Sequence, residues 1–209
     1  MYKFLIPLFA LGFLIIGCSP SKTTDLYGDS ASSPASTVTS SARPDPEFDG
    51  KLLTGKHKVT LKTSKGDIEL ELDADLAPKA VTNFVVLAES GYYDDLTFHR
   101  VKDNFMIQGG DPNGNGTGGR SIFGAVFENE QNNIQMVRGT VAMANRGPNT
   151  NGSQFFIIQA AATPWLQGGY TAFGKVTKGM DVVDAIAKVK TDPSDRPLEP
   201  ITFTPTVQK

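Results

Sequence analysis

The residues whose types most plainly suggest a chemical role lie in one stretch rich in glycine and asparagine, residues 111–119. Its first six residues, Asp-Pro-Asn-Gly-Asn-Gly, match the first half of an EF-hand calcium loop, in which oxygens at alternating positions converge on the ion. The twelfth position of such a loop needs a bidentate Glu, but here it is Ile122, and no amphipathic helix precedes the loop. The sequence therefore argues against calcium binding.

The same stretch also imitates a phosphate-binding loop. Gly114, Gly116 and Gly119 have the spacing G-x-G-x-x-G, and Arg120 stands where a phosphate loop carries lysine. A phosphate site requires that such a loop opens a helix, whose first N–H groups then face the anion. Residues 121–126 contain glycine and β-branched types and are a poor helix start. We therefore expect a glycine-rich surface loop.

Other kinds of site find little support in the chain. His57 and His99 lie far apart with no carboxylate cluster suited to a metal, so we expect no metal ligands and no cofactor. Ser153 lacks the flanking glycines of a nucleophile elbow. Cys18 is the only cysteine, which excludes an intramolecular disulfide. With 20 Lys and Arg against 22 Asp and Glu, the formal net charge is −2, and we expect no nucleic-acid binding.

The elements that must position any site are mostly short strands. Alternating apolar residues on both sides of a turn at 64–67 predict a β-hairpin. One amphipathic helix is expected to start at Pro78 and end before Gly91, and a second to cover 180–187. The other β-rich runs are residues 97–101, 105–108, 139–144, 155–158, 172–176 and 201–207. Many short strands with two helices predict a mainly β fold, an antiparallel barrel or sandwich.

Several segments share an unusual mixture of aromatic, amide and glycine residues. They are Phe98-His99-Arg100, Phe105 to Asp111, Met143-Ala144-Asn145, Gly147 to Ile157, and Trp165-Leu166. In this order and approximate spacing they closely resemble the cyclophilin family of peptidyl-prolyl cis/trans isomerases, and the likeness extends over residues 59–187. The resemblance implies a closed eight-stranded antiparallel barrel capped by two α-helices, in agreement with the strands and helices expected above.

Carried over by matching position, the resemblance assigns catalysis to Arg100, together with Gln108 and Phe105. It places further side chains around the substrate groove: Met106, Ala144, Asn145, Gln154, Phe156, Trp165, Leu166 and Tyr170. Tyr170 stands where most eukaryotic members carry a histidine, and this departure bears on peptide preference more than on activity. The resemblance also implies binding of the cyclic peptide cyclosporin, with Trp165 in favour of it and Tyr170 against.

The implied reaction breaks no bond, because it only rotates an amide whose resonance sets a barrier of ~18–20 kcal/mol. The pocket expected to hold the proline ring consists of Phe105, Met106, Phe156 and Leu166. Arg100 would donate a charged hydrogen bond to the twisted amide, and Gln108 would hold the guanidinium. A ~10⁵-fold acceleration needs about 7 kcal/mol, whereas one such bond gives roughly 1.5–3 kcal/mol. The dry groove and backbone clamping of the peptide at Asn145 must supply the rest.

The N-terminus has the pattern of an export signal. Lys3 is followed by an apolar run, residues 4–16, that is shorter than the ~20 residues of a spanning helix. The run ends in Ile-Ile-Gly-Cys at residues 15–18, which resembles the lipobox of bacterial lipoproteins, where the cysteine becomes the first mature residue and carries lipids. We expect a lipoprotein signal peptide over residues 1–17 and lipidation at Cys18. A plain signal peptide or a short membrane anchor is the alternative.

Residues 18–50, rich in Ser, Thr, Pro and Asp, predict a flexible tether, and residues 51–209 a monomeric isomerase domain. The expected location is extracytoplasmic, lipid-anchored to a bacterial membrane and facing the periplasm or the cell surface. In a Gram-negative host, Ser19 after the cysteine matches the outer-membrane pattern. The expected partners are proline-containing unfolded or flexible polypeptides, whose folding after export the enzyme assists. The alternative is a non-catalytic peptide-binding or chaperone module on the same fold.

Overall fold

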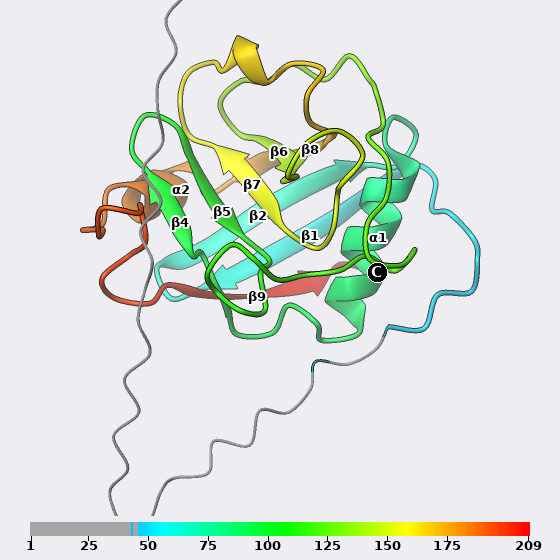
Figure 1. The fold of residues 1–209 in the computed structure, drawn as a ribbon, viewed down its shortest axis with the longest axis horizontal. Coiled ribbons are helices and arrows are strands. Elements are labelled where there is room, and N and C mark those ends of the chain that lie inside the picture. The colour runs from blue at the N-terminus through cyan, green and yellow to red at the C-terminus, as the bar shows by residue number, and fades with distance from the viewer. Residues whose placement is uncertain (1–42, 44–45) are drawn as a thin grey trace, which may run out of the picture. The chain divides into compact units, whose positions relative to one another are not determined.

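The computed structural model describes residue 43 and residues 46–209. The expected signal peptide, the lipidation site Cys18 and most of the expected tether lie outside the described residues. From residue 46 onward the chain forms mainly β structure with two α-helices and one short 3₁₀ helix, η1 (Pro164–Leu166) (Figure 1). Within this described part, no helix is long and apolar enough to cross a membrane.

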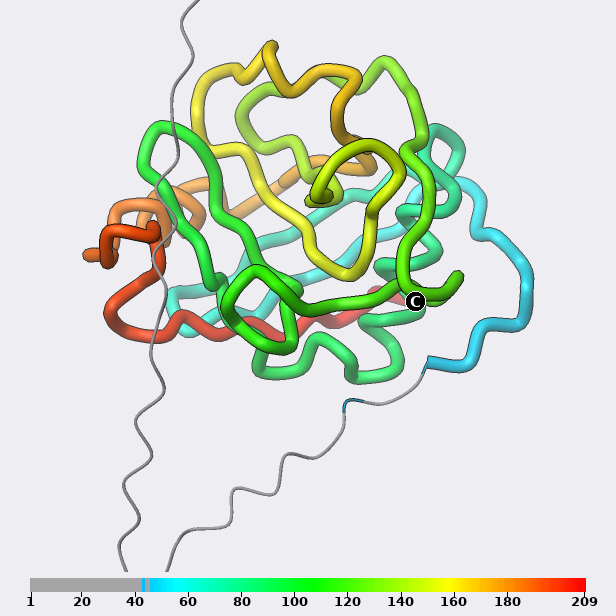
Figure 2. The backbone as a smooth tube through the Cα atoms, viewed as in Figure 1, coloured from blue at the N-terminus to red at the C-terminus, as the bar shows by residue number. Residues whose placement is uncertain are grey.

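A single antiparallel sheet of nine strands organises the fold. In chain order its strands are β1 (Lys56–Thr63), β2 (Gly66–Asp73), β3 (Leu96–Thr97), β4 (Arg100–Lys102), β5 (Met106–Gly109), β6 (Thr140–Met143), β7 (Phe155–Ile158), β8 (Ala172–Lys178) and β9 (Thr202–Val207). Across the sheet they run β3-β9-β1-β2-β8-β6-β7-β5-β4, and all the pairings are antiparallel. The backbone trace in Figure 2 shows how this sheet curls.

The two edge strands of this sheet, β3 and β4, are consecutive along the chain. Residues 97–101 were expected to form one strand, but residues 98–99 interrupt it because the N–H of Phe98 donates to the carbonyl of Ile201, 2.9 Å away. Among the described residues no ladder joins β3 directly to β4, so the chain itself connects the edges of the curled sheet. The mainly β, antiparallel, two-helix fold is confirmed, with nine strands in place of eight.

The first hairpin follows the alternation seen in the sequence. β1 and β2 pair over their full length, from Lys56 opposite Asp73 to Thr63 opposite Gly66. Their inward-facing residues are all buried: Val59, Leu61, Ile68, Leu70 and Leu72. Gly66 has φ +129°, a backbone conformation that favours glycine, so the turn requires this residue.

The two helices, α1 (Pro78–Glu89) and α2 (Met180–Ala187), begin where the sequence predicted. They lie at opposite sides of the curled sheet in Figure 1. Proline starts α1, but the preceding Ala77 offers no side-chain cap. A distant residue, Glu130, caps this helix instead: its two carboxylate oxygens accept the N–H groups of Lys79 and Ala80, both at 2.8 Å.

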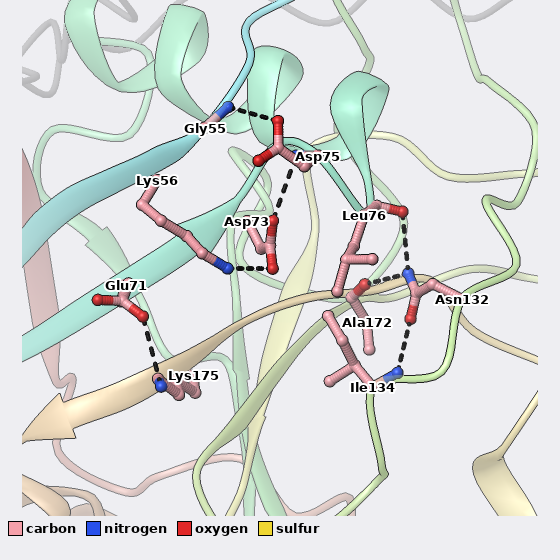
Figure 3. A network of polar contacts seen from close by, with 10 residues as sticks. All are labelled: Gly55, Lys56, Glu71, Asp73, Asp75, Leu76, Asn132, Ile134, Ala172 and Lys175. Carbon is pink, nitrogen blue, oxygen red and sulfur yellow. Dashed lines mark hydrogen bonds and ion pairs between the residues drawn. The ribbon is translucent and has the colours of Figure 1, made fainter.

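The long segment between β5 and β6 carries Glu130 and is fixed to the sheet by Asn132. The Asn132 amide donates to the carbonyl of Ala172 in β8 at 2.8 Å and accepts the N–H of Ile134 at 3.1 Å (Figure 3). The same view shows the ion pair between Lys56 and Asp73 at the ends of β1 and β2. The Asn132 contacts fix the segment that carries the helix cap, and this segment has no regular secondary structure.

The apolar interior divides into two clusters on opposite faces of β5, β6 and β7. The larger cluster contains Phe155, which packs edge-on against Phe84 at 5.1 Å and Phe203 at 5.5 Å between ring centroids. Its neighbour Phe156 belongs to the smaller cluster with Met106. Because side chains alternate along a strand, one of these two neighbouring phenylalanines fills the core while the other faces the groove.

Candidate active site

A cavity of about 310 Å³ opens on the outer face of β4, β5 and β7. Most of the residues that the sequence proposed for the site line it: Arg100, Phe105, Met106, Gln108, Ala144, Asn145, Phe156, Leu166 and Tyr170. Gln154 lines a smaller neighbouring pocket of about 80 Å³, to which Gln108 and Asn145 also contribute. Trp165 is 68% exposed, and its ring lies 6.4 Å from that of Phe105 in a stacked arrangement.

Strand register explains why these side chains meet. Arg100 in β4 pairs with Gln108 in β5, which pairs with Phe156 in β7, which pairs with Ala142 in β6. Directly paired residues project to the same face of a sheet, so this row faces outward. The alternate row, Val101, Ile107, Ile157 and Val141, is buried in the larger cluster. The register and the alternation of side chains along the strands therefore bring the site residues together on one face of the sheet.

The floor of the cavity is apolar and closely packed. Met106, Phe156 and Leu166 are almost fully buried and belong to the same cluster. Tyr170 packs edge-on against Phe156 with ring centroids 5.5 Å apart, which leaves its hydroxyl as a polar group beside an otherwise apolar wall. A slot of this composition suits a compact aliphatic ring and keeps water from its neighbours.

Arg100 stands beside this slot with its guanidinium partly exposed. Its Nε and Nη2 donate to one oxygen, Oδ2 of Asp195, at 3.3 and 3.2 Å. Asp195 belongs to the loop between α2 and β9, well beyond the range that resembled the known family. The sequence offered no signal for this pairing, because the two residues are 95 positions apart.

The expected contact between Gln108 and Arg100 is not formed. The Gln108 amide instead donates to Oε1 of Gln154 at 2.9 Å. Gln154 in turn donates to the carbonyls of Gly116 and Gly118, at 3.1 and 2.8 Å. The two glutamines therefore link the groove wall to the glycine-rich loop, and the guanidinium is held by a carboxylate.

The glycine-rich loop is organised by the buried carboxylate of Asp111. Its oxygens accept the N–H groups of Asn113, Asn115 and Gly116, at 2.9, 3.0 and 2.5 Å. The loop consists of turns and leads into a short bridge at residues 121–124, so the prediction of a glycine-rich surface loop is confirmed. In the described part of the chain, no group of three or more His, Cys, Asp or Glu residues is arranged to hold a metal ion.

Five residues line the cavity that sequence reasoning did not assign to the site: His99, Asn115, Gly116, Ser194 and Arg196. His99 is only 6% exposed, and neither ring nitrogen has a hydrogen-bond partner among the described residues. Burial lowers the pKa of His99 below its ordinary value of 6.5, so the ring is neutral at pH 7. In the sequence, its position next to Arg100 was the available signal.

Asn145 is fixed at the groove wall by its own side chain. The amide donates to the carbonyl of Gly169 at 3.0 Å and its oxygen accepts the N–H of Gly147 at 3.3 Å. Both bonds hold the backbone of Asn145 beside the cavity, where an extended peptide would pass. This geometry suits the clamping role expected from the sequence.

Comparison with known proteins gives a consistent picture. Residues 58–207 match the family described as cyclophilin type peptidyl-prolyl cis-trans isomerase/CLD. Peptidyl-prolyl cis-trans isomerase 9 of Schizosaccharomyces pombe is 54% identical over 153 residues, which is 72% of this chain and 25% of that protein. An Arabidopsis thaliana peptidyl-prolyl cis-trans isomerase is 53% identical over 145 residues, 68% of this chain and 23% of that protein. The chain thus spans about a quarter of the length of these two relatives.

A solved structure agrees in fold. The cyclophilin type peptidyl-prolyl cis-trans isomerase of Cryptosporidium parvum superposes with a TM-score of 0.71 and 38% identity, covering 74% of this chain and 98% of that one. The same protein, crystallised in the presence of the dipeptide Ala-Pro, gives a TM-score of 0.70. Because the family match covers most of the chain and the fold agrees throughout the described domain, this chain belongs to the cyclophilin-type peptidyl-prolyl cis-trans isomerase family.

Proposed function

We propose that this protein catalyses rotation about the peptide bond that precedes proline in other polypeptides. One observation carries the proposal: the guanidinium of Arg100 lies on the same face of the sheet as the apolar slot formed by Met106 and Phe156, in one cavity. A solved relative supports it, since the Cryptosporidium parvum protein was crystallised in the presence of the dipeptide Ala-Pro.

The arrangement suits a reaction that needs only a preference for the twisted amide. Rotation breaks the amide resonance, so the nitrogen regains a lone pair that can accept a hydrogen bond. With the proline ring in the slot, a guanidinium N–H of Arg100 can donate to that nitrogen and stabilise the twisted form more than the planar one. Met106 and Phe156 exclude water, which strengthens this charged hydrogen bond.

An isomerisation assay on the full chain tests this role. We expect Arg100→Ala to lower kcat/KM for Ala-Pro peptides about tenfold or more, because one charge-assisted hydrogen bond is removed. Lys65→Ala, which removes one positive charge from the exposed β1–β2 turn, is the matched control and should leave the rate unchanged. Equal rates for the wild type and Arg100→Ala would sink the proposal. Unchanged binding of unfolded clients in that case would favour a peptide-binding module.

We propose further that the clients are exported polypeptides and that the enzyme reaches them from a lipid anchor at Cys18, outside the cytoplasm of a bacterium. The lipobox-like end of the apolar run at residues 15–18 and the polar composition of residues 18–50 support this. Mass spectrometry of the mature N-terminus provides the test. An unmodified first residue other than Cys18 would exclude the anchor.

We also propose that the domain acts as a monomer and binds cyclosporin. The cavity is formed by residues of one chain, which supports the first statement. The exposed ring of Trp165 stacks on Phe105, which lines the cavity, and this supports the second. Sedimentation analysis tests the first. An inhibition titration in the isomerisation assay tests the second, and full activity at saturating cyclosporin would contradict it.

A further inference from the structure

The loop between α2 and β9 contacts the side of the cavity that carries Arg100. Within it, Asp192 closes a tight turn: its Oδ1 accepts the N–H groups of Ser194 and Arg196, at 2.8 and 3.0 Å. Its backbone N–H donates to the carbonyl of Arg196 at 2.8 Å. This turn places Ser194 and Arg196 on the cavity lining and turns Asp195 toward β4.

Asp195 is tied to β4 by its backbone as well as by its side chain. Its carbonyl accepts the N–H of Val101 at 2.8 Å, next to the residue that its carboxylate contacts. Its φ is +63°, in the left-handed region that Asp and Asn tolerate better than most residues. The carboxylate is therefore held at a fixed place relative to the strand that carries Arg100.

We propose that Asp195 is the positioning residue for Arg100, the role that was expected of Gln108. This inference rests on the proposed function of Arg100. The two bonds from Nε and Nη2 to Oδ2 engage one edge of the guanidinium and leave the Nη1 donors for the substrate. Gln108 does not compete for the role, because its amide is bonded to Gln154.

The physical advantage is preorganisation. A long arginine side chain that must be ordered in the transition state loses rotamer freedom at that moment, which lowers the rate. Asp195 orders it before the peptide arrives. Lys102 Nζ, 3.9 Å from the same carboxylate oxygen, adds a second cation, so removal of Asp195 also leaves two like charges on one strand.

Two variants of Asp195 separate its side chain from its backbone conformation. Asp195→Gly removes the carboxylate and adopts a positive φ without strain. Asp195→Asn removes the charge but keeps an acceptor oxygen and tolerates the same φ. We expect kcat/KM of the full chain to fall about five- to tenfold for Asp195→Gly and about two- to threefold for Asp195→Asn, with KM unchanged.

Asp103→Asn is the matched control, because it removes one carboxylate from the exposed turn between β4 and β5 without touching Arg100. It should leave kcat/KM unchanged. In an Arg100→Ala background, Asp195→Gly should have no further effect, since a positioning residue acts only through its partner. A further loss there, or a rate equal to or above that of the wild type from Asp195→Gly alone, overturns the inference.

An NMR measurement separates this inference from the proposed function. The Nε–H of Arg100 should exchange slowly with solvent in the wild type and at least several-fold faster in Asp195→Gly, because the bond to Oδ2 is lost. Slow exchange in both proteins would refute positioning even if Arg100 is catalytic. Full activity of Arg100→Ala would refute the catalytic role of Arg100. The exchange rate of its Nε–H would still show whether Asp195 holds the side chain.

Discussion

At the scale of single residues, the site depends on atoms that are placed by close backbone approach. Gly118 is such a position, because its carbonyl accepts a bond from Gln154 while its Cα faces the buried Asp111. A Cβ added there would lie 2.3 Å from the Asp111 carboxylate and 2.8 Å from the Asn113 side chain. A side chain at this point of the loop would therefore force the Asp111 carboxylate and the Asn113 side chain to move.

Gly118→Ala tests this packing. The carboxylate of Asp111 must shift and lose part of its three backbone bonds, so we expect a loss of about 1–3 kcal/mol in the free energy of unfolding, with weaker peptide binding at the adjoining groove. Gly152→Ala is the control, because its added Cβ would meet no atom closer than 3.6 Å. Urea unfolding of both variants gives the comparison, and equal midpoints would contradict the close approach.

At the scale of elements, helix α1 depends on a residue that is remote in sequence. Glu130 satisfies the N–H groups of Lys79 and Ala80, which would otherwise have no acceptor at the helix start. Burial raises the pKa of the Glu130 carboxyl, and the two backbone bonds oppose that shift. The cap therefore joins the irregular segment before β6 to the helix that covers the main core.

Glu130→Gln should destabilise the fold by about 1–2 kcal/mol, because an amide offers only one acceptor oxygen to two N–H groups. Glu128→Gln is a suitable control: Glu128 is on the same segment, but it is exposed and only pairs with Lys79 at the surface. That change should leave the stability nearly unchanged, because the pair is exposed to solvent. Thermal unfolding at pH 7 distinguishes the two, and the reverse ranking would argue against the cap.

At the scale of the whole molecule, α2 is tied to the sheet by one polar cluster. Arg138, just before β6, donates through Nη1 and Nη2 to the two oxygens of Asp184 in α2, at 2.9 and 2.6 Å. Gln159, just after β7, donates to the same carboxylate at 2.9 Å. The hydrogen bond from Arg138, followed by that from Gln159, lowers the pKa of Asp184 below 3.8.

This cluster predicts a pH dependence of stability. Because the folded pKa of Asp184 is lower than the unfolded one, the stabilisation is fully present above pH 3.8 and is lost as the pH falls through the folded pKa. We expect Asp184→Asn to lower the free energy of unfolding by about 1 kcal/mol at pH 7, since the pair is partly exposed. The difference from the wild type should shrink toward zero in strong acid. If the difference in free energy of unfolding stayed constant from pH 7 to strong acid, the ionised Asp184 carboxylate would not be its cause.

Local patterns in the sequence predicted much of the fold. The hairpin, the starts of both helices and strand β7 lie where periodicity and turn residues indicated, because these features depend on neighbours along the chain. The same alternation along β7 places Phe155 in the core and Phe156 at the groove. The break at residues 98–99 was missed, since it depends on a bond to Ile201.

The sequence by itself determined the family and the residue types of the groove, whereas the pairing of β4, β5 and β7 decided that Arg100 and Phe156 share one face. Only the tertiary structure decided which groups hold them. Asp195 replaced Gln108 as the partner of Arg100, and Glu130 became the cap of α1. Such partners join segments that are distant along the chain, and their pairing follows from how the sheet curls, which no local pattern records.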